Sequence, residues 1–262
     1  MFQTDATPDS RIAGAAALLA DIRRGRRQPC PGLPEGLGPT SIAEAEAIQL
    51  ATYAALGWNI AGWKVGRTRD QAIACPLPDA TVAPAADATL HLPIGCAMEL
   101  EVALQLRQGL DATLLAALQP ADLPTIAEAV ILFEFCESRF SNGRKASDLE
   151  KLADCVTNGS CVFSPATGAW TWADIETLEM RLTVDGIEVA RHAGPHRAMP
   201  LAELVAAWRD RCLAIGHLPK AGEIITLGSQ TGMLPVPAAG GLLVGEWAGR
   251  GRLECQVAPL GS

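Results

Sequence analysis

Two glutamates alternate with apolar residues in the segment 97–104, whose sequence is AMELEVAL. Alternation with a period of two predicts a β-strand, and side chains two residues apart on a strand point to the same face. Glu99 and Glu101 are therefore expected side by side, with Cβ atoms roughly 7 Å apart. Like charges on one face repel each other unless a cation lies between them. Two interpretations follow: a solvent-exposed face with two acids, or a site for a hard divalent cation that requires a third oxygen ligand.

A third carboxylate interrupts the apolar run 130–136, which predicts a buried strand. Glu134 has six apolar neighbours in this run, and an unpaired carboxylate in such surroundings is costly. One explanation is a buried ion pair, for which Arg139 is the candidate partner. The other is metal ligation, in which Glu134 supplies the third oxygen ligand for a cation at Glu99 and Glu101.

A lysine occupies the middle of another short apolar strand, 60–66 (IAGWKVG). A buried ammonium is costly unless an anion lies near, so Lys64 either extends to solvent at the strand end or faces the acids. Three glutamates and this lysine form a coherent set for Mg²⁺ or Mn²⁺ held by carboxylates. The four histidines are spread along the sequence, and we expect all of them to be non-ligands.

The composition fits one large domain with a sizeable core, since 49 % of the 262 residues are hydrophobic and 19 % are charged. The net charge of −8 argues against nucleic acid or an anionic membrane as the main partner. Eight cysteines occur without a CxxC pair or a zinc-like spacing, which indicates a reducing compartment. We therefore expect a cytoplasmic protein.

The elements that must position these residues are predicted as helices first and then mostly strands, which argues for an α+β fold. Helices are predicted at 9–24, 41–56 and 200–215, with a short one opened by Thr125 and Glu128 and another ending at Asp154. Strands are predicted at 60–66, 97–104, 130–136, 158–164, 180–189 (a hairpin about Asp185-Gly186), 224–226, 242–247 and 252–257. Residues 70–95 are rich in Pro, Ala and Asp and are predicted as a loop that forms a lid or a site wall.

Several of these segments, taken in order, resemble the fumarylacetoacetate hydrolase superfamily, and within it the 2-keto-4-pentenoate hydratase group. Gly62–Gly66 (GWKVG) resembles the family's lysine strand, and 98–103 (MELEVA) resembles its metal-binding strand with two glutamates. The segment 134–139 (EFCESR) resembles the one whose first acid is the third metal ligand. Later signatures are matched at 153–154, at 200–201 with Trp208, and at 220–229.

The resemblance implies a fold in which an N-terminal helical region, 1–58, packs on a mixed β-roll, 59–262, within one continuous domain. It implies a hydratase of aromatic catabolism that adds water to a 2-hydroxy-2,4-dienoate and yields a 4-hydroxy-2-oxo acid. Relatives are typically homo-oligomers, and some associate with a pathway decarboxylase.

The resemblance also assigns residues. Glu99, Glu101 and Glu134 would hold Mg²⁺ or Mn²⁺. Lys64 would contact substrate oxygens or move a proton, with a lowered pKa because it is partly desolvated near a metal. Ser229 would contact the substrate carboxylate, and Asp79, which follows Pro78, would activate water.

Three other functions remain open: a 2-oxo-3-enedioate (4-oxalocrotonate-type) decarboxylase, an acylpyruvate-type C–C hydrolase, and a catalytically silent scaffold or partner subunit. The hydrolases usually carry a His–Glu pair in the N-terminal part of the domain, and this chain has no histidine before His91. The sequence departs from the hydratase pattern at Cys155, where Asn is usual, at Met199, where His is usual, and at 226–227, where the usual order of Leu and Thr is reversed.

Overall fold

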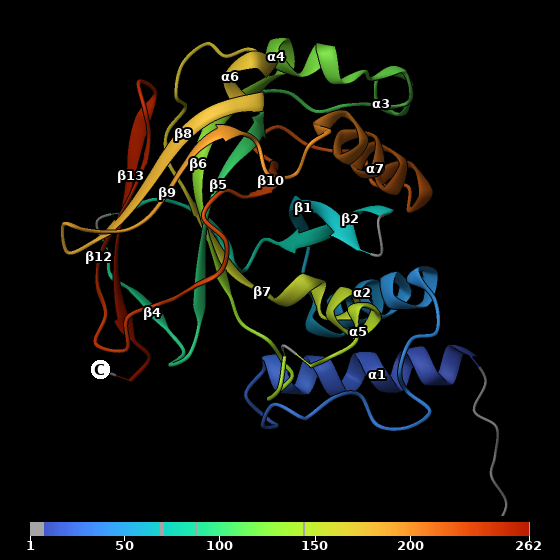
Figure 1. Ribbon diagram of the computed structural model, residues 1–262. Coiled ribbons are helices and arrows are strands. Elements are labelled where there is room, and N and C mark those ends of the chain that lie inside the picture. The colour runs from blue at the N-terminus through green and yellow to red at the C-terminus, as the bar shows by residue number, and fades with distance from the viewer. Residues whose placement is uncertain (1–7, 69–70, 87, 144, 262) are drawn as a thin grey trace, which may run out of the picture.

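The computed structural model describes residues 8–68, 71–86, 88–143 and 145–261. Its first two helices, α1 (Pro8–Arg23) and α2 (Ile42–Leu56), pack against each other at the lower right of Figure 1. Ser41 caps α2, because its side chain accepts a hydrogen bond from the Glu44 N–H, and Gly57 ends the helix in the left-handed conformation at φ 71°. Both helices confirm the sequence prediction for this region.

The larger sheet carries the residues of interest. Within the described residues its strands run in the order β2-β1-β10-β5-β6-β7-β3, and β11 pairs with β5. The bounds are β1 (Ile60–Thr68), β2 (Gln71–Pro78), β3 (Val82–Pro84), β5 (Ala97–Leu106), β6 (Ala127–Cys136), β7 (Asn158–Phe163), β10 (Ile224–Ser229) and β11 (Leu234–Pro235). β1 and β10 are parallel, whereas β10, β5, β6 and β7 pair antiparallel in that order.

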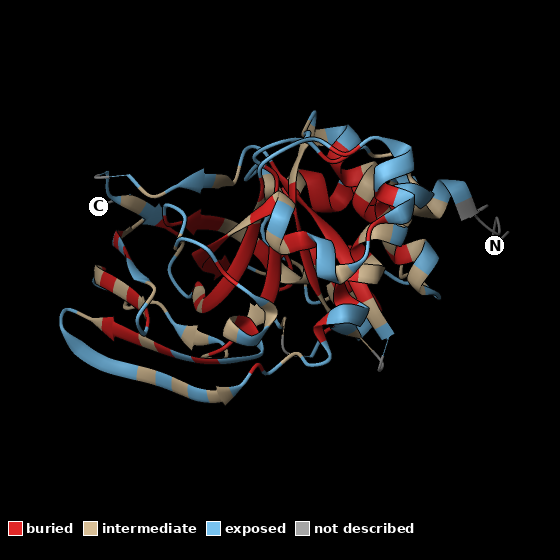
Figure 2. Ribbon diagram, turned by 90° about the horizontal axis from the view of Figure 1, so that it is seen from above, coloured by how far each residue is buried: buried red, intermediate tan, exposed pale blue. Residues whose placement is uncertain are grey.

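A smaller sheet covers one face of the larger one and runs in the order β4-β13-β12-β8-β9. The bounds are β4 (Leu90–Leu92), β8 (Thr177–Val184), β9 (Ile187–Pro195), β12 (Gly241–Trp247) and β13 (Gly251–Pro259). The sheets approach closely at Gly245, where an added Cβ would lie 2.4 Å from Leu100 and 3.1 Å from Phe133. The main apolar core therefore fills the space between the sheets, and buried residues are concentrated there in Figure 2.

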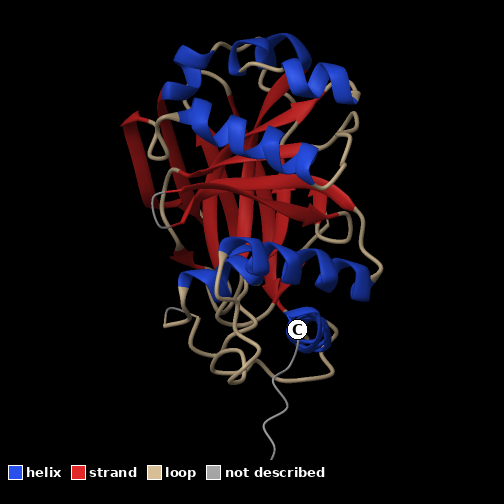
Figure 3. Ribbon diagram, turned by 90° about the vertical axis from the view of Figure 1, so that its right-hand side faces the viewer, coloured by secondary structure: helices blue, strands red, loops and turns tan. Residues whose placement is uncertain are grey.

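The other helices lie toward the two ends of the strands, as Figure 3 shows. Of these, α7 (Leu201–Ala214) packs on β1 and β2 through a buried face that includes Trp208. The short helices are α3 (Ala112–Ala117), α4 (Leu123–Ile126), α5 (Asp148–Ala153) and α6 (Trp172–Glu176), with 3₁₀ turns η1 (Pro120–Asp122) and η2 (Cys155–Thr157). None of the helices in the described part of the chain is both long enough and apolar enough to cross a lipid bilayer.

The fold confirms the predicted α+β class, with helices at the N-terminus and curled mixed sheets. Two local predictions are wrong. The segment 70–95 contains β2, β3 and β4; β2 is buried along most of its length, so it shows no alternation, and its prolines are tolerated because it lies at an end of the sheet. The helix predicted from Thr125 and Glu128 ends at Ile126, and Glu128 already belongs to β6.

Candidate metal and catalytic site

The strand register places the predicted acidic residues on one face of the larger sheet. β5 and β6 pair so that Glu99 lies directly opposite Glu134, while Glu101 lies opposite Leu132. Directly opposed residues on antiparallel strands share a face, and so do residues two apart on one strand. The three carboxylates therefore meet on the face that points away from the smaller sheet.

Lys64 joins the same face through two further pairings. It lies beside Thr226 on β10, and Thr226 lies beside Ala103 on β5. Its Nζ is 2.7 Å from Glu134 Oε2 and 3.8 Å from Glu99 Oε2. The ion-pair partner of Glu134 is therefore Lys64, and the pairing with Arg139 considered from the sequence is wrong.

The neighbouring carboxylates shift the pKa values of Lys64 and Glu101. Burial lowers the pKa of Lys64, but the carboxylates of Glu134 and Glu99 outweigh that effect and raise its pKa well above the ordinary value. The direction is opposite to the lowered pKa expected from the sequence. Burial, together with the charges of Glu134 and Glu99, raises the pKa of Glu101 to about 8.

Glu101 has one oxygen bonded and one oxygen without a partner. Oε2 accepts a hydrogen bond of 3.0 Å from the backbone N–H of Gly228, which has a left-handed φ of 97° that suits glycine. Oε1 is buried and has no hydrogen-bond partner among the described residues. Ser229 pairs with Glu101 in register, and its Oγ accepts a hydrogen bond from the Gly232 N–H at 2.9 Å. The predicted substrate contact at Ser229 thus lies beside the acidic face.

A cysteine that the sequence analysis did not select also lies on this face. Cys136 follows Glu134 by two residues on β6, and its Sγ donates a hydrogen bond to Glu99 Oε2 at 3.5 Å. One ligand atom each from Glu99, Glu134 and Cys136 lies within 4.8 Å of the other two. Glu101 is not part of that group. The i, i+2 spacing of Glu134 and Cys136, the same as that of Glu99 and Glu101, was the signal that could have found it.

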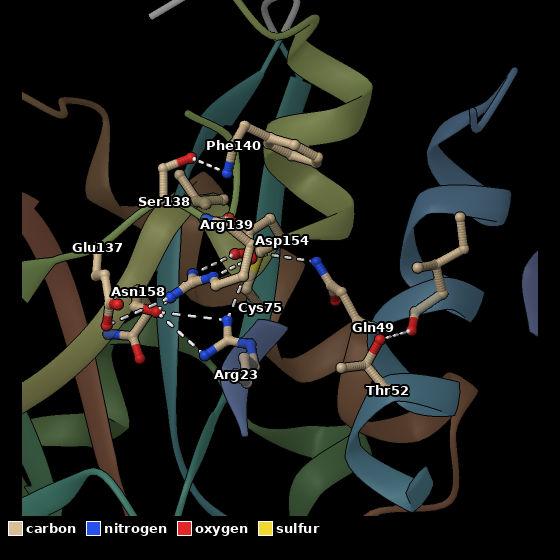
Figure 4. A network of polar contacts seen from close by, with 12 residues as sticks. Arg23, Gln49, Thr52, Cys75, Glu137, Ser138, Arg139, Phe140, Asp154 and Asn158 are labelled. Atoms are coloured by element: carbon tan, nitrogen blue, oxygen red, sulfur yellow. Dashed lines mark hydrogen bonds and ion pairs between the residues drawn. The ribbon is translucent and has the colours of Figure 1, made fainter. Parts of the chain in front are cut away.

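A buried polar network contacts Glu134 through Asn158, and Figure 4 shows the part of it formed by Asn158, Arg139, Asp154 and Arg23. The side-chain amide of Asn158 donates to Glu134 Oε1 at 3.0 Å, and the Asn158 carbonyl accepts from Arg139 Nη2 at 2.8 Å. Arg139 Nε lies 2.5 Å from Asp154 Oδ1, and Arg23 of α1 reaches the same oxygen at 3.4 Å. Four successive polar contacts thereby link the N-terminal helix to Glu134.

The turn between Asp154 and Asn158 has an unusual backbone. Cys155, Val156 and Thr157 have φ values of 54°, 49° and 61°, although two of them are β-branched. Such residues cost about 1–3 kcal/mol each in the left-handed region and persist only where their surroundings fix them. The carbonyl of Val156 accepts a hydrogen bond from Lys64 Nζ at 3.3 Å, and that of Thr157 accepts from the Glu137 N–H at 2.8 Å. The strained turn therefore points a carbonyl at the lysine.

Asp79 does not join the site. It is exposed, and its carboxylate accepts hydrogen bonds from the side chain of Asn59 at 2.9 Å and from the Asn59 N–H at 3.3 Å. The Asn59 amide lowers the pKa of Asp79. Cys75 is the residue that pairs with Lys64 on the neighbouring strand. Asp79 lies four residues beyond Cys75, which corresponds to roughly 13 Å along a strand.

The four histidines have other partners. His196 is buried and bonded to Gln230, and His217 is bonded to Glu223 at 3.0 Å. His91 is exposed and His192 is partly buried, and both lie against backbone carbonyls.

Comparison with known proteins finds solved structures that have a similar fold. No protein-family model and no curated protein sequence matches the chain. Among solved structures, 4-oxalocrotonate decarboxylase from Pseudomonas putida G7, determined with magnesium and adipate, has a TM-score of 0.73 and 18 % identity. The match covers 96 % of this chain and 99 % of that chain.

Two further solved structures are similar over a smaller part. The 5-carboxymethyl-2-hydroxymuconate delta-isomerase from Mycobacterium smegmatis has a TM-score of 0.56 and 16 % identity, covering 78 % of this chain and 81 % of that chain. Fumarylpyruvate hydrolase from Pseudomonas aeruginosa, determined with Mn²⁺ and pyruvate, has a TM-score of 0.50 and 14 % identity, covering 75 % and 88 %. The chain therefore has the fold that these enzymes share.

Proposed function

We propose that the protein is a divalent-metal-dependent enzyme that acts on a small 2-oxo acid or its 2-hydroxydienoate tautomer. The observation that carries this proposal is the acidic face formed by Glu99, Glu101 and Glu134. On this face the Lys64 ammonium lies close to the carboxylates of Glu99 and Glu134. Solved structures with the same fold were determined with magnesium and adipate, calcium and acetate, or Mn²⁺ and pyruvate. Their ligands combine a divalent cation with a small carboxylate, which supports the same substrate class here.

The donor set suits a hard divalent cation. Glu101 Oε1 is a buried acceptor without a partner in the described residues, and Lys64 already lies between two of the acids as a cation would. The side chains of Lys64 and Glu99 are 10 % and 13 % exposed, while those of Glu101 and Glu134 are fully buried, so the small exposed part of the face lies at Lys64 and Glu99. In this proposal the three glutamates hold Mg²⁺ or Mn²⁺.

The chemistry is divided between the ion and the chain. A bound divalent ion would act as a Lewis acid toward the substrate carboxylate and C2 oxygen and so favour the enolate form. Lys64 would donate a proton to the carbanionic carbon. The Lys64 ammonium is held by its hydrogen bond to the backbone carbonyl of Val156. Asn158 donates to the Glu134 carboxylate, and Ser229, which pairs with Glu101 in register, would bind the substrate carboxylate.

The sequence motifs favour hydration as the overall reaction. A 2-hydroxy-2,4-dienoate would take a proton from Lys64 at its distal carbon and become an α,β-unsaturated 2-oxo acid. Addition of one water would then give the 4-hydroxy-2-oxo acid. This reaction needs a group that activates water, and Asp79, the residue suggested from the sequence, has its contacts with Asn59 instead.

Decarboxylation of a 2-oxo-3-enedioate is the second candidate. Loss of CO₂ leaves an electron pair that is delocalised onto the C2 oxygen, and protonation by Lys64 completes the reaction without a water-activating base. The remote position of Asp79 favours this candidate. The similarity to 4-oxalocrotonate decarboxylase over nearly the whole of both chains is consistent with it but shows the fold alone.

The test is an assay with 2-hydroxypenta-2,4-dienoate and with 2-oxohex-3-enedioate, each with Mg²⁺, with Mn²⁺ and with a chelator. Mass spectrometry of the products separates a gain of one water from a loss of CO₂. We expect metal-dependent turnover of one of the two substrates. Failure to turn over either substrate while a metal ion is bound would contradict the proposed substrate class, and failure to bind metal would favour the silent partner subunit.

A further inference from the structure

We propose that Cys136 is an additional ligand in the cation site, and that its sulfur makes the site prefer a thiophilic divalent ion such as Zn²⁺, Co²⁺ or Fe²⁺ over Mg²⁺. The proposal rests on the proposed function to the extent that it assumes a cation at the acidic face. It goes further, because carboxylates alone favour Mg²⁺, Ca²⁺ and Mn²⁺, whereas a thiolate favours softer metals.

The geometry of the three ligand atoms carries the proposal. Cys136 Sγ lies 3.5 Å from Glu99 Oε2, and the ligand atoms of Glu99, Glu134 and Cys136 are all within 4.8 Å of one another. An oxygen at ~2.0 Å and a sulfur at ~2.3 Å from one tetrahedral ion lie about 3.5 Å apart. The sulfur and the carboxylate are thus already at the separation that a shared ion requires.

The position of the thiol is also rigid. Cys136 and Glu134 lie on β6, Glu99 lies on β5, and these strands are paired along their whole length. Side chains carried by paired strands hold a site more firmly than side chains carried by loops.

The ordinary explanation for a buried cysteine is that it fills space in an apolar core. That explanation suits Cys96, Cys212 and Cys255, which belong to the main apolar cluster. Cys136 is buried, yet it belongs to none of the apolar clusters in the described part of the chain. Its sulfur instead contacts a carboxylate. A second observation points to a ligand at the same face: the fully buried Glu101, whose Oε1 has no partner among the described residues.

Formation of the metal–sulfur bond replaces the S–H bond of Cys136, and the proton leaves to solvent. A thiol that coordinates a divalent cation loses its proton for this reason. The bound sulfur then contributes one negative charge, which adds to those of the glutamate ligands.

Cobalt gives the most direct test, because a Co²⁺–thiolate bond has a near-ultraviolet sulfur-to-metal charge-transfer absorption that a carboxylate site lacks. The full-length protein is freed of metal with a chelator and titrated with Co²⁺, by spectroscopy and by calorimetry. The variants are Cys136→Ser and Cys136→Val. Cys96→Ser is the matched control, since Cys96 is also buried and its sulfur donates to the Cys136 carbonyl without reaching an acid. Circular dichroism establishes that each variant is folded.

We expect the absorption in the wild type and in Cys96→Ser, and its loss in both Cys136 variants. Affinity for Zn²⁺ should fall by about 10-fold or more in Cys136→Val, the range in which even outer-shell partners of metal sites act, while affinity for Mg²⁺ should hardly change. Co²⁺ bound by the wild type without the absorption would overturn the role of Cys136 and leave the proposed function intact. Absence of any divalent-ion binding would overturn both.

Discussion

Replacement of Asp154 by asparagine removes one negative charge from the network behind the site while keeping the size of the side chain. Asp154 and Arg139 are 0 % and 2 % exposed, and the nearby Arg23 guanidinium is 6 % exposed. Burial and the charge of Arg139 lower the pKa of Arg23, and both buried cations pair with the Asp154 carboxylate. Breaking a buried ion pair by removing one partner costs about 3–5 kcal/mol. We expect a loss of that size in the free energy of unfolding.

Urea unfolding followed by circular dichroism measures the effect, and the midpoint of thermal unfolding should fall by roughly 6–20 °C for a chain of this length. The control is Asp148→Asn, which removes the same charge from an exposed pair with Lys151 at 3.7 Å and should change stability by at most about 0.5 kcal/mol. Because Asp154 also anchors the turn that presents Val156 to Lys64, metal affinity should weaken in the buried variant only. Equal, small effects in both variants would refute the reasoning.

Three other predictions concern the strand that carries the lysine, the lysine itself and a buried histidine. Gly62→Ala should destabilise the protein, because an added Cβ would lie 2.5 Å from the Ile224 carbonyl, whereas Gly66→Ala on the same strand has open space and should be tolerated in urea unfolding. Lys64→Met should lower turnover by about 10²–10⁴-fold, as loss of a general acid does. Full turnover in this variant would contradict the assignment of Lys64 as the proton donor. Burial lowers the pKa of His196 to about 4. The stability that the neutral imidazole contributes above pH 6.5 is therefore lost as the pH falls toward 4. Over this range the free energy of unfolding of the wild type should fall by about 3 kcal/mol more than that of His196→Gln.

The period-two pattern was sufficient to predict which residues share the acidic face. Glu99 and Glu101 lie together because alternation fixes the face of a strand, and Glu134 and Lys64 were identified because a charge in an apolar run needs a partner. The N-terminal helices were predictable for a similar reason, since capping residues such as Ser41 act locally. Local sequence patterns therefore predicted which acids and lysine form the site, and they predicted the fold class.

Contacts between distant strands were not predictable in the same way. Sequence spacing suggested Arg139 as the partner of Glu134, because no local pattern reveals that β1 lies two strands from β5 across β10. Asp79 was selected by its position after Pro78, but the hairpin register of β1 and β2 carries it away from Lys64. Cys136 was overlooked because cysteine in an apolar run is normally a core residue. Strand register, which long-range pairing sets, decided the first two of these cases.

Calorimetric titration of Mn²⁺ into the metal-free protein tests whether the acidic face binds a divalent cation. We expect one bound ion per chain in the wild type and a loss of binding in Glu134→Gln. Glu137→Gln is the matched control, because Glu137 lies three residues further along with a carboxylate that is 45 % exposed and paired with Arg139; it should bind Mn²⁺ as the wild type does. Unchanged binding in Glu134→Gln, or no binding in the wild type, would contradict the assignment of this face as a metal site.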